Sequence, residues 1–83
     1  MYAFILYSLK EFEAAIESWN KTIKINLNYI EAYNGRGNAF IKLKKFDDAI
    51  INFNQAIKIN PNYFEAYNNL GNAFINLEKL DQA

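Results

Sequence analysis

The stretch that decides the fold is Glu31–Phe40, EAYNGRGNAF, because it returns 34 residues later as Glu65–Phe74, EAYNNLGNAF. Between Glu31–Ala49 and Glu65–Ala83, 13 of 19 positions are identical at that offset. A fixed period of this size indicates stacked copies of one supersecondary unit. Each copy can bury its apolar face only against its neighbours. The sequence therefore predicts part of a solenoid.

The same offset extends toward the amino terminus. Residues 3–29 align with residues 37–63, and 12 of these 27 positions are identical. The chain accordingly divides into an incomplete first repeat, a complete second repeat and an incomplete third repeat. Their boundaries are 1–29, 30–63 and 64–83.

Apolar residues recur at helical spacing within each copy. The pattern Phe12, Ala15, Ile16, Trp19, Thr22 and Ile23 returns as Phe46, Ala49, Ile50, Phe53, Ala56 and Ile57. Polar breaks separate these runs, and proline ends one of them at Asn60-Pro61. We therefore expect antiparallel pairs of helices, each of about 13 to 15 residues, joined by tight turns.

Local signals predict how the helices begin and end. Asn28 with Glu31, and Asn62 with Glu65, have the spacing of a capping box. The last full helix is predicted to run from about Tyr63 to Leu77. The four residues that follow Lys79 are too few to make a second helix alone.

Glycine stands inside two of the predicted helices, at Gly37 and Gly71. Each glycine costs roughly 1 kcal/mol relative to alanine in a helix interior. Because this cost recurs at the same position of the repeat, we expect a neighbouring helix to approach closely at both glycines. Phe40 and Phe53 are expected to fill the space beside these contacts.

Composition restricts the function. The chain has 83 residues, 9 basic and 9 acidic residues and a net charge of zero. Scattered charges of this kind argue against a nucleic-acid or membrane-surface partner. Cysteine and histidine are absent, which removes the commonest nucleophile–base pairs and metal ligands. We therefore expect no catalytic residues, no cofactor and no metal, and we read the acidic pair Asp47-Asp48 as favourable charges in a first helical turn.

These residues resemble the tetratricopeptide repeat, a helix-turn-helix unit of 34 residues. Its pattern is an aromatic, a Leu-Gly pair, a large residue, then alanine, aromatic, alanine and proline. In the middle copy these positions hold Tyr33, Arg36-Gly37, Phe40, Ala49, Phe53, Ala56 and Pro61. In the third copy they hold Tyr67, Leu70-Gly71, Phe74 and Ala83. The first copy keeps Ala3, Leu6, Ala15, Trp19 and Thr22 in kind, with Leu27 in place of proline.

The resemblance implies an all-α, right-handed α-solenoid of antiparallel helix pairs that acts as a non-catalytic scaffold for protein–protein interaction. Arg36 departs from the family, which buries leucine there, and we expect a local loosening between the first two copies. The first helices would line a concave groove for a peptide or a partner helix. Carried over by position, the groove residues are Glu31, Asn34, Gly35, Asn38, Ile41, Lys42, Glu65, Asn68, Asn69, Asn72, Ile75 and Asn76.

Asparagine dominates this set, and its side chain both donates and accepts hydrogen bonds, which suits a peptide backbone. The alternative is a solvated helix face in an asparagine-rich protein. Chaperone-binding members of the family hold a terminal carboxylate with lysines and asparagines, and Asn38 and Asn69 match two such asparagines. Asn34 stands where one of the lysines is required, however, and in the other frame Glu65 would repel a carboxylate. We therefore do not expect that clamp.

Two further functions compete with the scaffold. An RNA-binding helical repeat has a similar period, although neutral charge weighs against it. Self-association is the other, because the apolar residues Tyr67, Leu70, Phe74 and Leu77 lack the second helix of their repeat. End-to-end stacking, or exchange of helices that places Met1–Leu9 over the end of another molecule, would cover them. The partner and the compartment stay open, with the cytoplasm or nucleus favoured.

Overall fold

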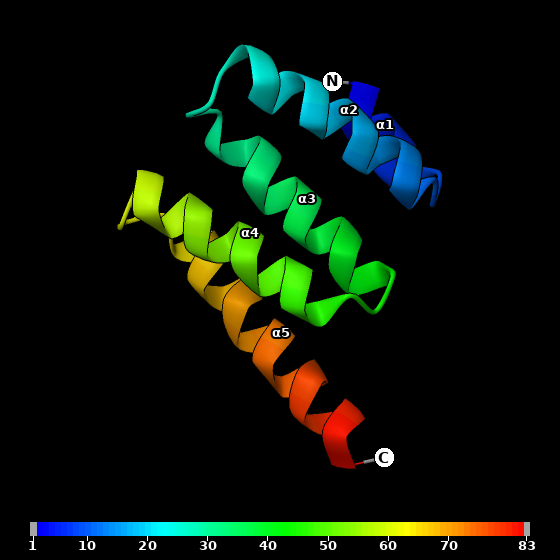
Figure 1. Ribbon diagram of the computed structural model, residues 1–83, viewed down its shortest axis with the longest axis vertical. Coiled ribbons are helices and arrows are strands. Elements are labelled where there is room, and N and C mark those ends of the chain that lie inside the picture. The colour runs from blue at the N-terminus through cyan, green and yellow to red at the C-terminus, as the bar shows by residue number, and fades with distance from the viewer. Residues whose placement is uncertain (1, 83) are drawn as a thin grey trace.

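The computed structural model describes residues 2–82, and side chains from Ala3 to Lys79. The described residues form five helices and no strand (Figure 1). Their bounds are α1 Tyr2–Ser8, α2 Phe12–Ile25, α3 Ile30–Lys42, α4 Phe46–Ile59 and α5 Phe64–Gln82. Each helix packs on the next, and α3 also contacts α5. The predicted all-α stack of helix pairs is confirmed, while Met1 and the family alanine at Ala83 lie outside the described residues.

Two large aromatic side chains form the centres of the core. Trp19 of α2 and Phe53 of α4 are both fully buried. Alanines without accessible surface surround them, and Phe40 packs against the cluster that contains Phe53. Trp19 and Phe53 stand 34 residues apart, so the same position of the repeat supplies the centre of each layer. The expectation that Phe40 and Phe53 face inward is confirmed.

Close approach of these rings explains two of the three glycines. A Cβ atom on Gly37 would lie 2.5 Å from the Phe53 ring, and one on Gly35 would lie 2.3 Å from the Trp19 ring. Successive helical residues are separated by about 100°, so positions 35 and 37 point to nearly opposite sides of α3. One glycine admits α2 and the other admits α4. The predicted contact at Gly37 is thus confirmed.

The prediction for Gly71 was wrong. No atom lies within 4 Å of the Cβ position at Gly71, and the residue is exposed. The ring that contacts Gly37 comes from α4, and no helix of the described chain stands in the same relation to α5. Figure 1 shows the carboxyl-terminal part of α5 extending past the rest of the stack.

The turn after the first helix of a repeat has a lysine in the left-handed region. Lys10 has φ 63° and Lys44 has φ 61°. In the first of these turns the Glu11 N–H donates to the Leu6 carbonyl and the Lys10 N–H donates to the Tyr7 carbonyl. Lys44 and Lys45 make the same pair of bonds, so both turns are Schellman motifs. Glycine normally marks this motif, which is why the sequence did not predict it.

The third repeat does not form this turn. Helix α5 continues to Gln82, past the end predicted at Leu77. Its residue equivalent to Lys10 and Lys44 is Glu78, which lies within the helix. A left-handed residue costs roughly 1–2 kcal/mol, which a returning second helix offsets by packing. Four residues cannot make that helix, so continued helical hydrogen bonding is the more stable local structure.

The capping box predicted at Asn28 does not form. Helix α3 has Tyr29 at its N-cap position with no side-chain cap, so Asn28 does not cap it. Instead, the side chain of Asn26 makes a local hydrogen bond in the turn: its Oδ1 accepts the Asn28 N–H at 3.1 Å. The Asn60 Oδ1 accepts the Asn62 N–H in the same way at 3.0 Å. These asparagines stabilise the turns between repeats, not the helix starts.

Arg36 also differs from expectation. Its Nε donates to the Asn52 Oδ1 at 2.6 Å and its Nη1 donates to the Asn20 Oδ1 at 2.7 Å. Its guanidinium carbon lies 5.4 Å from the centre of the Tyr33 ring. Asn52 is buried, and its amide is fixed by a 2.8 Å bond to the Asp48 carbonyl. The arginine thus joins α3 to both α2 and α4, where we had expected a loosening.

The two glycines that the sequence made equivalent are expected to respond oppositely to alanine. Gly37→Ala forces the buried Phe53 ring to move and should lower the free energy of unfolding by about 1–3 kcal/mol. Gly71→Ala meets no neighbour and should raise it by roughly 1 kcal/mol through helix propensity. Urea denaturation followed by Trp19 fluorescence at low micromolar concentration measures both. Shifts of the same sign in the two variants would contradict this account of the packing.

Candidate functional site: the α3–α5 face

The predicted groove residues lie on α3 and α5, and we call the set of nine polar ones the α3–α5 face. Its members are Glu31, Asn34, Asn38, Lys42, Glu65, Asn68, Asn69, Asn72 and Asn76. Helices α3 and α5 contact each other, because both are first helices of neighbouring repeats. Most of the nine side chains are exposed or half-buried, and Asn34 alone among them is buried. The face is therefore mainly accessible to a ligand.

The structure brings three of these residues together in one hydrogen-bonded chain. The Asn34 Nδ2 donates to the Glu65 Oε2 at 3.3 Å, and the Asn69 Nδ2 donates to the Asn34 Oδ1 at 3.0 Å. The Tyr63 hydroxyl donates to the same Glu65 oxygen at 3.1 Å. We call these four residues the Asn34 network. It links α3 to α5 across the repeat boundary, so Asn34 is a structural residue more than a free ligand-binding one.

Tyr63 was not predicted, and its hydroxyl is perturbed by its surroundings. Burial is the largest cause that raises the pKa of Tyr63 to about 12, followed by its hydrogen bond to Glu65 and the negative charges of Glu65 and Glu31. Glu31 lies in the first turn of α3 and Glu65 in the first turn of α5. Glu31 and Glu65 therefore form an acidic edge, where α3 and α5 begin.

Three other members of the predicted groove differ from expectation. Gly35 faces the Trp19 ring and is buried, so it does not line the groove. Ile41 packs against the Phe53 cluster. The Asn76 Nδ2 donates to the Asn72 carbonyl one turn earlier at 2.8 Å, which occupies one of its two donors. Asn38, Asn68 and Asn72 keep their side-chain amides available on α3 and α5.

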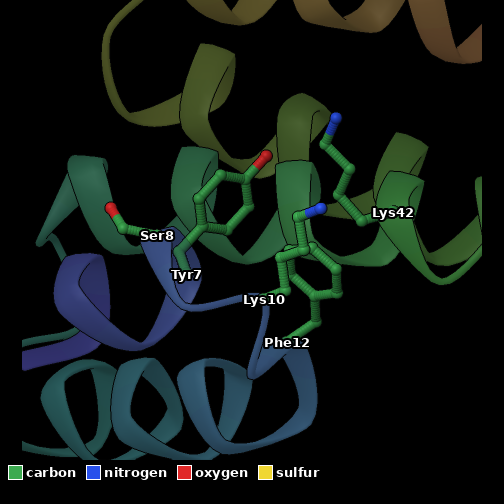
Figure 2. A pocket seen from close by; sticks show the side chains of 5 residues that line it. All are labelled: Tyr7, Ser8, Lys10, Phe12 and Lys42. Carbon is green, nitrogen blue, oxygen red and sulfur yellow. The ribbon is translucent and has the colours of Figure 1, made fainter.

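A pocket that sequence reasoning missed lies at the opposite edge. The pocket has a volume of about 570 Å³ and lies between α1, the α1–α2 turn and α3 (Figure 2). Its lining residues are Tyr7, Ser8, Lys10, Phe12 and Lys42. Lys42 alone was among the predicted groove residues. Phe12 had been assigned only to helix packing, and nothing in its spacing indicates that the turn leaves a hollow beside it.

The chemistry available on the α3–α5 face is that of hydrogen bonding and charge. Amides can both donate to and accept from a peptide backbone, and the lysine and glutamate edges can select charged side chains. Within the described residues no group of acidic side chains is placed to hold a metal ion. None of the described helices is both long enough and apolar enough to cross a membrane.

The Tyr63–Glu65 contact predicts a dependence of stability on alkaline pH. Because the folded state raises the pKa of Tyr63 from 10.0 to about 12, it binds this proton more tightly than the unfolded chain. The resulting stabilisation is complete below pH 10 and is lost as the pH rises toward 12. Denaturation between pH 9 and 12 should show a steeper loss for the natural chain than for Tyr63→Phe. Glu65→Gln should lower the pKa of Tyr63 in an absorbance titration, and an unchanged titration would contradict the contact.

Comparison with known proteins agrees with this architecture. The family model described as "TPR repeat" matches residues 5–44 and again residues 37–77. The comparison with curated protein sequences gives no match. Solved structures do match. The first TPR domain of human RPAP3 superposes with a TM-score of 0.92 at 30% identity, covering 98% of this chain and 64% of that one.

Two complexes are also similar. The first TPR of Spaghetti (RPAP3) bound to the HSP90 peptide SRMEEVD matches with a TM-score of 0.87 at 32% identity, over 92% of this chain and 60% of that one. The TPR2B domain of yeast Sti1, in a pHsp70 complex, matches with a TM-score of 0.89 at 25% identity, over 96% and 64%. This chain thus spans less than two thirds of each of these three structures. The family model covers most of its length, and the chain belongs to the tetratricopeptide repeat family.

Proposed function

We propose that the chain is a protein-interaction scaffold that binds an extended peptide along the α3–α5 face. The observation that carries this proposal is the difference between the packed and the accessible positions of α3. Its glycines and Ala39 pack against neighbouring helices, whereas Asn38 keeps an accessible amide, as do Asn68 and Asn72 on α5. A row of such amides can pair with a peptide backbone whatever its side chains.

Similar structures support a peptide ligand. Spaghetti (RPAP3) was solved with an HSP90 peptide, and yeast Sti1 with pHsp70 and pHSP90. Here, however, Glu65 is held by Asn34 and Tyr63 at the acidic edge. A carboxylate at that edge would meet a negative charge. We therefore propose peptide binding by backbone recognition, with any acidic group of the peptide placed elsewhere.

The scaffold role is proposed as non-catalytic. The chain contains no histidine and no cysteine, and the α3–α5 face is built from amides, two carboxylates and a lysine. Asp47 and Asp48 lie exposed in the first turn of α4, where negative charge favours the helix dipole. RNA binding is a less favoured candidate, because an acidic edge on the same face repels phosphates.

Selection from a displayed library of random ten-residue peptides tests the peptide-binding proposal, with affinities then measured by fluorescence anisotropy. Asn38→Ala and Asn72→Ala should each weaken the selected peptides about two- to tenfold, the loss expected for one hydrogen bond. Asn54→Ala, an exposed asparagine of α4, is the matched control and should change nothing. Failure to select any peptide, or equal losses in all three variants, would count against the α3–α5 face.

A second candidate function rests on a different surface, the open face of α5, which consists of Tyr67, Gly71 and Phe74. Tyr67 is 46% exposed, whereas its equivalent Tyr33 is 6% exposed beneath its neighbours. Phe74 is 52% exposed, whereas its equivalent Phe40 packs in the core. Leu70 was predicted to be uncovered as well, but it packs against the Phe53 cluster, and Leu77 is half-buried. We propose that a helix of a second copy of this chain covers the open face.

Self-association predicts a mass that rises with concentration in analytical ultracentrifugation through the high micromolar range. Phe74→Lys should abolish that rise, because a charge would have to be buried in the interface. Ile51→Lys changes an apolar residue of α4 that is more exposed than Phe74, and it should leave the rise intact. A single monomeric species at all concentrations, or equal effects of the two variants, would exclude this interface.

A further inference from the structure

We infer that the pocket at the α1–α2 turn is an anion subsite that receives the carboxylate of an acidic residue in a bound peptide. This inference rests on the proposed function, because the peptide along the α3–α5 face delivers that residue. Lys42 belongs to both the α3–α5 face and the pocket, so the two surfaces are continuous. Figure 2 shows the ends of Tyr7, Lys10 and Lys42 around one opening.

The donors of the pocket have no competing partner. Within the side chains from Ala3 to Lys79, no ion pair joins Lys10 or Lys42 to a carboxylate, and the Tyr7 hydroxyl has no hydrogen-bond acceptor. The Tyr7 hydroxyl is protonated at neutral pH and can donate, and burial raises its pKa further. Two ammonium groups and one phenol around a single hollow are complementary to one carboxylate.

Packing holds the Tyr7 ring in place, and the turn holds the Lys10 backbone. The Tyr7 ring meets the Phe12 ring edge-on at 5.3 Å between centroids and lies 6.2 Å from the Trp19 ring. Lys10 is the left-handed residue of the Schellman turn, so its backbone is fixed by two hydrogen bonds. The aromatic walls also offer an apolar surface for the residue next to the acidic one. The volume of about 570 Å³ suits a pair of peptide side chains.

The charge distribution favours one carboxylate over a phosphate chain. Glu31 and Lys42 stand eleven residues apart on α3, which is about 16 Å at 1.5 Å per residue. This exceeds the Debye length of about 10 Å at 0.1 M salt, so the acidic edge does not neutralise the basic one. A nucleic acid crossing the face would meet both edges. A peptide can place its acidic residue at the basic edge alone.

The second repeat shows that this chemistry is not a general consequence of the fold. The residues equivalent to Tyr7, Phe12 and Lys42 are Ile41, Phe46 and Asn76. Both Ile41 and Phe46 pack inward there, and the phenol and one ammonium group are lost. Lys44 is equivalent to Lys10 and has the same backbone conformation. Lys44 therefore provides a matched control for Lys10.

Nuclear magnetic resonance titration of the ¹⁵N-labelled chain tests the subsite. The probes are acetyl-leucyl-glutamate amide, its glutamine counterpart and inorganic phosphate. The glutamate probe should shift the backbone amides of Tyr7, Lys10 and Lys42 and bind at least threefold more tightly than the glutamine probe. Two variants, Lys10→Asn and Lys42→Gln, should each weaken binding of the glutamate probe about two- to fivefold. The controls Lys44→Asn and Lys58→Gln should not. Asparagine is chosen at position 10 because it tolerates positive φ.

Three results would overturn the inference. They are equal affinity for the glutamate and glutamine probes, chemical-shift changes located away from the pocket, or tighter binding of phosphate than of the glutamate probe. The library selection separates this failure from failure of the proposed function. If selected peptides depend on Asn38 and Asn72 but need no acidic residue, the subsite is wrong and the scaffold stands. If the glutamate probe fills the pocket while no peptide is selected, the subsite stands as an anion site and the peptide-binding proposal fails.

Discussion

Contact between an aromatic ring and a glycine backbone sets the spacing of the helices. Trp19 against Gly35 and Phe53 against Gly37 bring α2 and α4 to opposite sides of α3. The Trp19 Nε1 is buried without an acceptor among the described residues, a cost of about 1–3 kcal/mol. Burial of an indole removes roughly 150–250 Å² from water, worth about 4–6 kcal/mol at 25 cal/mol per Å². Packing therefore outweighs the unsatisfied donor, and the ring stays in the layer.

Polar side chains then connect layers that the aromatic rings have brought together. Arg36 reaches Asn20 and Asn52 on the two neighbouring helices, and Asn34 reaches Glu65 one repeat further along. Each bond is individually modest, at about 0.5–1.5 kcal/mol net. Their geometry matters more than their strength. Both the nitrogen and the oxygen of the Asn34 amide bond to residues of α5, so they hold α3 and α5 in one register.

Two surfaces are left available by this arrangement, and they differ in character. The α3–α5 face is polar, with a glutamate where each helix begins and Lys42 where α3 ends. The open face of α5 is apolar, because the position that α4 occupies on α3 has no counterpart there. The proposed peptide ligand rests on the first surface, and the proposed self-association rests on the second.

The sequence by itself determined the helices, their order, the 34-residue period and the residues that form each layer. These follow from apolar spacing, which is local and repeats. Only the tertiary structure decided that Asn34 is buried, that Arg36 joins three helices, that Gly71 is open and that a pocket forms beside Lys10. Each depends on atoms supplied by another helix: Asn34 and Glu65, for example, are 31 residues apart. A repeat makes positions equivalent in sequence, but their environments differ wherever a neighbouring helix is present on one copy and absent on the next.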